Sequence, residues 1–206
     1  MGVKPPVLAA PPIILKEFVM PRIGIIVGSL AKNSINKKVA QSLMGLAPAD
    51  AELSILDFSA LPLYSYDFDT DYPQVAKDWK SAIEDVDGII IVTPEYSRSI
   101  PGALKNALDW AARPWGTNSF GGKPVAIMGA STGAVGTAIA QQHLRQILAH
   151  LNAPTMGQPE TFFHFKPAAF GPNGEILDEG VGAILQNFVD AAVVHVERNA
   201  LERAAA

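Results

Sequence analysis

The sequence of 206 residues contains no cysteine. That absence excludes disulfides, thiolate metal ligands, Cys-ligated clusters and a cysteine nucleophile, so any redox chemistry requires a bound cofactor. Charge is also scarce, because only 17% of the residues are charged, the formal net charge is -4, and no long basic run occurs. The chain therefore lacks the electrostatic signature of a protein that binds nucleic acid or an anionic membrane surface.

The histidines are few and scattered along the chain. They match no metal-ligand spacing, so the sequence predicts structural or surface roles and no metal site. The four are His143, His150, His164 and His195.

The composition predicts one folded domain. Hydrophobic residues make up 49% of the sequence, which at this length supports a single well-buried core. Residues 1–21 contain five prolines, and Lys16 and Glu17 interrupt their apolar runs. We expect this segment to be neither a signal peptide nor a membrane span but a flexible extension. We therefore expect a single domain over residues 22–199 and a C-terminal tail over residues 200–206.

From residue 22 onward, short apolar runs alternate with amphipathic segments, as in βαβ units around a parallel sheet. Strands are expected at residues 22–28, 52–57, 88–93, 124–129 and 161–165. Helices are expected at residues 34–46, 73–86, 101–112, 136–151 and 181–199. This pattern favours an α/β fold with a doubly wound five-stranded parallel sheet, order 2-1-3-4-5, and helices on both faces. A ligand crevice would then lie beyond the carboxyl ends of the first and third strands.

The loop after the first expected strand has the features of an anion site. It opens a helix with Ser29, Ser34 and Asn36 as donors, and it contains no acidic residue. A helix N-terminus leaves backbone N–H groups unpaired and carries partial positive charge, so this loop predicts a bound phosphate. The alternative is an ordinary helix start in which Ser34 is only the N-cap. The loop matches neither a G-x-G-x-x-G motif nor a Walker A motif.

Two more loops are expected at the same edge of the sheet. In residues 93–102, two prolines bracket a polar turn that can offer backbone groups to a planar ring, with Tyr96 as an aromatic wall. Alternatively, Pro94 and Pro101 only punctuate a strand-to-helix turn. The glycines of residues 129–136 permit close backbone approach by a ligand. Together the three loops fit a ligand with a phosphate and a flat heterocycle.

Two motifs carry a resemblance to a known family. They are Gly28-Ser-Leu…Ser34-Ile-Asn36 and Thr93-Pro-Glu-Tyr…Ser99-Ile-Pro-Gly…Leu104-Lys-Asn-Ala-Leu-Asp-Trp110. Over residues 22–196 the chain resembles the NADPH-dependent FMN reductases, a family that includes bacterial quinone and chromate reductases. The resemblance implies a flavodoxin-like fold, non-covalent FMN, NADPH or NADH as co-substrate, and a homodimer or homotetramer.

The resemblance also implies which residues line the cofactor site. The first loop would hold the FMN phosphate, the second would lie along the isoalloxazine ring and ribityl chain, and the third would border the ring. The implied residues are Ser29, Ala31, Ser34, Ile35 and Asn36, then Pro94, Glu95, Tyr96 and Ser97, and finally Ser131 and Gly133. This chain departs from close family members, which often have arginine at the position of Ala31 and asparagine followed by an aromatic at Ser97-Arg98.

The implied activity is a ping-pong oxidoreduction in the cytoplasm. Hydride passes from the nicotinamide to flavin N5, and a quinone, free flavin or another small acceptor, such as chromate or an azo compound, then takes the electrons. The flavin supplies the chemistry, so no catalytic side chain is assigned. One alternative is a flavodoxin-like electron carrier, which the weak acidity disfavours, and another is a flavin-free regulatory or structural module.

An aromatic and acidic segment follows the second expected strand. Residues 64–71 are expected near a subunit interface and the active-site rim, because aromatic side chains are favoured at interface cores. Further along, Trp110 and Trp115 flank Arg113-Pro114. For these tryptophans, core or interface packing is a better explanation than stacking on the flavin.

Overall fold

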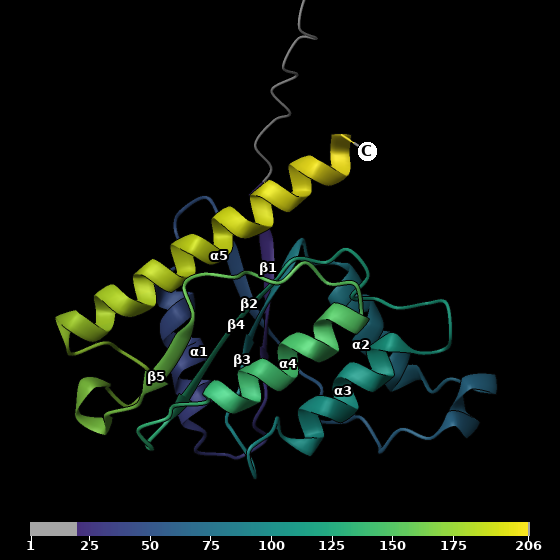
Figure 1. Ribbon diagram of the computed structural model, residues 1–206, viewed down its shortest axis with the longest axis horizontal. Helices are drawn as coiled ribbons and strands as arrows, with labels where there is room; N and C mark the ends of the chain where they lie inside the picture. The colour runs from purple at the N-terminus through teal and green to yellow at the C-terminus, as the bar shows by residue number, and fades with distance from the viewer. Residues whose placement is uncertain (1–19, 206) are drawn as a thin grey trace, which may run out of the picture.

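A five-stranded parallel sheet in the order β2-β1-β3-β4-β5 forms the centre of the computed structural model (Figure 1). The structure describes residues 20–205, so the expected N-terminal extension lies almost entirely outside the described residues. The strands are β1 (Arg22–Val27), β2 (Glu52–Leu56), β3 (Gly88–Val92), β4 (Val125–Ser131) and β5 (Thr161–His164). The helices are α1 (Ile35–Gly45), α2 (Gln74–Glu84), α3 (Gly102–Ala112), α4 (Ala138–His150) and α5 (Glu179–Ala205), with short 3-10 helices η1 (Tyr66–Thr70) and η2 (Pro167–Ala169). The predicted fold class and strand order are confirmed.

The central strands are apolar because helices cover both of their faces. All five residues of β3 are buried, and so is every residue of β1 after Arg22. Ile25 of β1 pairs with Ile55 on one side and with Ile90 on the other. This pairing aligns the carboxyl ends of the strands at one edge of the sheet, which is the lower edge in Figure 1.

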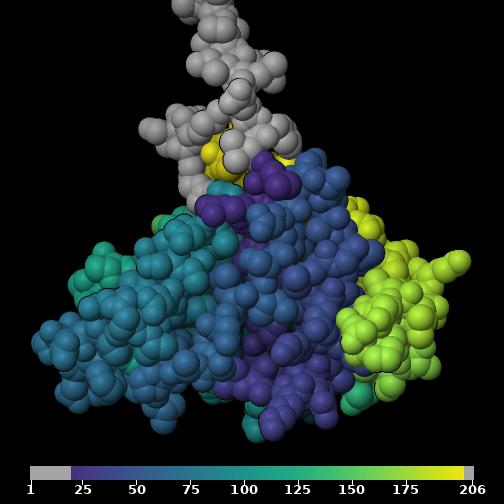
Figure 2. All heavy atoms as spheres, turned by 180° about the vertical axis from the view of Figure 1, so that it is seen from behind, coloured from purple at the N-terminus to yellow at the C-terminus, as the bar shows by residue number. Residues whose placement is uncertain are grey.

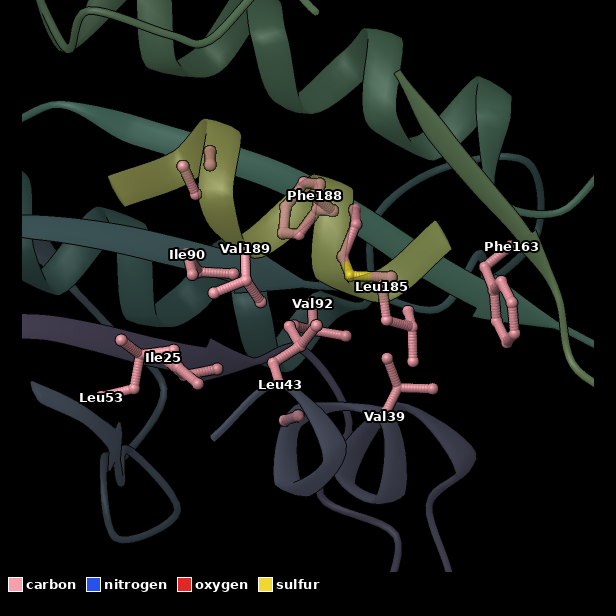
Figure 3. Close-up of a cluster of buried hydrophobic side chains, with 14 of the residues drawn as sticks. Ile25, Val39, Leu43, Leu53, Ile90, Val92, Phe163, Leu185, Phe188 and Val189 are labelled. Carbon is pink, nitrogen blue, oxygen red and sulfur yellow. The ribbon is translucent and has the colours of Figure 1, made fainter. Parts of the chain in front are cut away.

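Alternate strand residues contribute to two separate hydrophobic clusters. On one face, α1 and α5 pack over Ile25, Ile90 and Val92 (Figure 3). On the other face, α2, α3 and α4 pack over residues that include Ile26 and Ile91. The alternation follows from the two-residue period of a strand. The loops at the carboxyl edge therefore lead into helices that belong to different layers.

Several element boundaries differ from the expected ones, mostly by one or two residues, and two of the differences have a clear physical reason. Helix α4 begins at Ala138, two residues later than expected, because Gly136 has a φ of +62° that interrupts a right-handed helix. Helix α5 continues to Ala205, so residues 200–205 extend the last helix and do not form a separate tail. The residues after Asn199 are good helix formers without glycine or proline.

Among residues 20–205, no helix combines the length and the apolar character needed to cross a bilayer.

The segment of residues 64–71 projects from the sheet and appears as the blue-green lobe at the lower left of Figure 2. Its rings pack within the chain, around the buried Trp110. Ring centroids lie 5.1 Å from Trp110 for Tyr64, 5.3 Å for Phe68 and 5.1 Å for Tyr72, the residue just after the segment. Internal packing thus accounts for Tyr64, Phe68 and Tyr72, whereas Tyr66 remains exposed and the interface role of the segment stays a prediction.

Arg113, at the end of α3, links the same segment to this helix through polar contacts. Its Nε donates to the Tyr64 hydroxyl at 2.9 Å, and its guanidinium also forms an ion pair with Asp69. Burial and the hydrogen bond to Asp69 raise the pKa of Tyr64 above its ordinary value. Trp115, by contrast, is 83% exposed, so the two tryptophans have different environments.

Candidate functional site

The loops after β1, β3 and β4 begin side by side at the carboxyl edge of the sheet. The N–H of Gly28 donates to the carbonyl of Val92 at 2.9 Å, and the N–H of Thr93 donates to that of Met128 at 3.0 Å. The approach is so close at Gly129 that a Cβ atom there would lie 2.1 Å from the carbonyl oxygen of Thr93. The strand order therefore brings the three predicted loops to one place.

The first loop presents unpaired backbone donors. Ser34 is the N-cap of α1 and accepts a hydrogen bond from the N–H of Lys37 at 3.2 Å. The N–H groups of Ile35 and Asn36 have no protein acceptor among the described residues. No acidic residue occupies the first turn of α1, and Lys32 and Lys37 are exposed nearby. This combination of free donors and positive potential suits an anion.

The same loop is braced by its own polar groups. The Ser29 hydroxyl accepts from the N–H of Ala31 at 3.3 Å, and the carbonyl of Ala31 accepts from the N–H of Ser34 at 3.2 Å. The Ser29 hydroxyl accepts from Ala31, and the Ser34 hydroxyl accepts from Lys37, so each hydroxyl still has a proton to donate.

The Asn36 side chain makes contacts that the sequence does not predict. Its side chain is buried, and its amide makes two hydrogen bonds with the backbone of Ala130, of 3.0 Å to the carbonyl and 2.9 Å from the N–H. The side chain therefore joins α1 to the end of β4. The backbone N–H of Asn36 makes no hydrogen bond to the described residues and is left for a bound anion.

The second loop forms a tight hairpin. Tyr96 and Ser99 exchange backbone hydrogen bonds of 2.9 and 3.0 Å. Between them, Ser97 and Arg98 have φ angles of +50° and +64°. The Tyr96 side chain is exposed, which leaves its ring available as a wall for a planar ligand. Before the hairpin, Pro94 accepts a hydrogen bond on its carbonyl from the Thr93 hydroxyl at 2.8 Å.

Glu95 caps a helix. Its Oε2 accepts hydrogen bonds of 3.1 Å from the N–H groups of both Ile139 and Ala140, at the start of α4. The N-cap residue Thr137 makes no such bond with its own side chain. A carboxylate at a helix N-terminus is stabilised by the helix dipole. The sequence gives no signal for this contact, because 44 positions separate Glu95 from Ile139.

The third loop is short and open. The Ser131 hydroxyl accepts from the N–H of Gly133 at 3.0 Å, so these two predicted residues contact each other. The Ser131 carbonyl accepts from the N–H of Phe165 at 2.8 Å, which ties the loop to the chain after β5. Residues 132–135 are exposed at the rim.

A separate cavity of about 970 Å³ lies between α3 and α4. Its lining includes Tyr64, Arg113, Trp115 and His150, and it shares no residue with the three loops. This cavity adjoins the projecting segment, and the predicted cofactor residues lie elsewhere.

Comparison with known proteins identifies the family. The model of the NADPH-dependent FMN reductases matches residues 21–168, which include all three loops. The chain belongs to this family. The predicted recognition, the FMN cofactor and the dependence on a reduced nicotinamide are thereby confirmed.

Several similar proteins are quinone reductases by name. A 2-hydroxy-1,4-benzoquinone reductase of a Burkholderia species is 51% identical over 169 residues, which are 82% of this chain and 92% of that protein. A quinone reductase of Pseudomonas putida is 39% identical over 178 residues, 86% of this chain and 95% of that protein. Among solved structures, the NAD(P)H:(acceptor) oxidoreductase FerB of Paracoccus denitrificans matches with a TM-score of 0.83 and 40% identity, covering 87% of this chain and 98% of that one.

Proposed function

We propose that this FMN reductase family member is an NAD(P)H-dependent quinone reductase, with FMN bound where the three loops meet. The observation that carries the proposal is the acid-free start of α1, whose Ile35 and Asn36 N–H groups are unpaired beside a rigid hairpin. A phosphate and a flat ring can be bound side by side there. Relatives named as quinone reductases support the choice of acceptor. Free flavin, chromate and azo compounds are further candidate acceptors.

The site residues divide into three groups by the part of FMN that each would hold. The first loop would bind the phosphate through its hydroxyls and backbone N–H groups, the second would lie along the ring and ribityl chain, and the third would border the ring. These groups are Ser29, Ala31, Ser34, Ile35 and Asn36, then Pro94, Glu95, Tyr96 and Ser97, and finally Ser131 and Gly133.

The protein would act by binding and orientation. Bound FMN supplies the hydride chemistry, so the chain needs no nucleophile. The backbone N–H groups of Glu95 and Ser97 would stabilise negative charge on the ring, since Pro94 has no N–H and the N–H of Tyr96 donates to Ser99. The hairpin would hold the reacting faces of the two cofactors in the geometry that hydride transfer needs. Glu95 supports this geometry through its contacts with α4.

A visible spectrum of the purified protein tests the function. A yellow protein should lose its flavin absorbance when NADPH or NADH is added without oxygen, and a quinone should restore it. A flavin that stays oxidised with both nicotinamides would contradict the proposal and favour a one-electron carrier. A protein that remains colourless after incubation with FMN would favour a flavin-free module.

We also propose that the chain forms at least a homodimer and acts in the cytoplasm, where reduced nicotinamides are available. The exposed Leu63, Tyr66 and Trp115 support self-association, because exposed large apolar side chains favour contact with a partner. Trp115 also lines the cavity between α3 and α4.

A further inference from the structure

The hairpin of the second loop has an unusual sequence for its shape. Positive φ angles at both central residues define a type I′ turn, which usually contains Asn-Gly or another pair that tolerates this conformation. Here the pair is Ser97 and Arg98, with φ angles of +50° and +64°. A long side chain in the left-handed region has a conformational cost, and such strain often occurs at functional sites.

Helix α4 holds this hairpin from the side. Glu95 accepts from the N–H groups of Ile139 and Ala140, and the Ser99 hydroxyl lies 3.1 Å from Nδ1 of His143, one turn further along α4. Contacts on both sides of Ser97 and Arg98 therefore fix the hairpin. Fixation of this kind allows a strained turn to persist.

The hairpin fixes the backbone of Arg98 and leaves its guanidinium exposed to solvent. The guanidinium makes one hydrogen bond, of 3.2 Å to Glu95 Oε1, and the arginine side chain is 69% exposed. An arginine has five N–H donors in a planar fork, so most of them remain available to a ligand. The Glu95 carboxylate is shared with α4, which leaves Arg98 the freer partner of the pair.

The hairpin of Arg98 and the phosphate loop contact helices in different layers of the fold. Glu95, the partner of Arg98, contacts α4, which packs in the cluster on one face of the sheet, whereas the first loop leads into α1 on the other face. Lys32 and Lys37 already supply positive charge at the start of α1. The first loop therefore has its own donors and positive charge for the FMN phosphate, which leaves Arg98 for another ligand.

We propose that Arg98 binds the negative charge of the electron acceptor and makes the enzyme selective for anionic quinones, such as deprotonated hydroxyquinones. The proposal rests on the proposed function, since it needs a quinone beside the ring loop. A hydroxyl group on a quinone ring is acidic because the negative charge of its anion is shared with a carbonyl oxygen. When the two oxygens are neighbours, the planar guanidinium fork can bind both of them. A relative that is 51% identical is named for a hydroxyquinone.

The experiment compares two acceptors of the same ring system in the holoenzyme. Steady-state kcat/KM is measured for 2-hydroxy-1,4-naphthoquinone, which is anionic at neutral pH, and for neutral 1,4-naphthoquinone. Arg98→Gly removes the charge with a residue that favours positive φ, and Arg98→Lys keeps the charge without the fork. Arg22→Gln serves as a matched loss of charge, because Arg22 is exposed at the opposite edge of the sheet.

In Arg98→Gly, kcat/KM for the hydroxyquinone should fall by about three- to ten-fold, while that for the neutral quinone should change by less than about two-fold. Arg98→Lys should recover part of the loss, and Arg22→Gln should resemble the wild type. Added salt should lower the hydroxyquinone value in the wild type and have little effect in Arg98→Gly.

Equal losses for both quinones, or no loss for either, would overturn the selectivity. So would a loss confined to the rate of flavin reduction by NADPH relative to NADH, since Arg98 would then recognise the 2′-phosphate. Failure of the proposed function has a different signature, because the wild-type protein would then reduce neither quinone.

Discussion

Glu95 accepts a hydrogen bond of 3.1 Å from the backbone N–H of Ile139, and this contact joins the predicted ring loop to the start of α4. The same carboxylate oxygen also accepts from the next N–H of the helix. A group that makes these contacts is well placed to hold the loop and poorly placed to exchange protons with a ligand. We therefore expect Glu95 to act through position.

Glu95→Gln should bind FMN and keep most of its activity, because the amide oxygen can still accept from α4. Loss of the charge at the helix N-terminus should cost about 0.3–1 kcal/mol of stability. Stopped-flow measurements can follow flavin reduction by NADPH and reoxidation by a quinone as separate phases. A variant with normal FMN content that loses about a hundred-fold or more in either phase would identify Glu95 as a proton donor instead.

Pro94→Gly, unlike Glu95→Gln, should weaken FMN binding and lower the activity. Proline restricts the backbone where the loop leaves β3, and glycine would add conformational freedom that binding must then remove. We expect lower FMN retention after gel filtration and slower turnover even with added FMN. Normal values for both would show that the shape of the loop does not limit catalysis.

Ser34→Ala and Asn36→Ala should separate binding from stability. Loss of the Ser34 hydroxyl should cost about 1 kcal/mol of cap energy and lower FMN affinity about ten-fold or more. Asn36→Ala leaves the backbone groups of Ala130 unpaired in a buried place, so its main effect should be a loss of about 2 kcal/mol or more in unfolding free energy. FMN titration and urea unfolding of the apoprotein measure the two quantities. Unchanged FMN affinity in Ser34→Ala would remove the phosphate assignment.

Self-association should depend on the exposed Trp115. Light scattering at micromolar concentration should give at least a dimer for the wild type, and Trp115→Glu should shift the population toward the monomer, since a buried unpaired charge is costly at an interface. Leu177→Glu is a suitable control, because Leu177 is also exposed but lies outside the cavity between α3 and α4. A monomeric wild type, or equal effects of the two substitutions, would contradict this interface.

The pH dependence of stability should include a contribution from Glu175. Hydrogen bonds from its own backbone N–H and from Asn173 lower the pKa of its carboxyl below the ordinary value of 4.5. The folded state therefore favours the ionised form, and its stabilising effect is complete above that ordinary value and is lost as the pH falls through the lowered pKa. The gap in unfolding free energy between the wild type and Glu175→Gln should be widest near neutral pH and narrow in acid. A gap that does not vary with pH would show that this carboxylate makes no such contribution.

The sequence predicts those parts of the molecule that depend on local pattern. Runs such as the GIIIV of β3 identify buried strands, and Ser34 identifies a helix start. Contacts between distant segments leave no local pattern, which explains why the links from Asn36 to Ala130 and from Glu95 to Ile139 were not predicted. In the aromatic segment, the sequence alone does not reveal which apolar side chains pack on their own chain: Tyr64 and Phe68 pack on Trp110, whereas Tyr66 is exposed.

The division of the helices between the two faces of the sheet has a consequence for the lifetime of the holoenzyme. On the proposed assignment, the cofactor touches one loop that continues into α1 and another that is fastened to α4, and these helices pack in separate clusters. A transient opening of either layer would then be enough to release the flavin. The dissociation rate of FMN should therefore follow the less stable layer, and excess FMN should slow amide hydrogen exchange in both layers together.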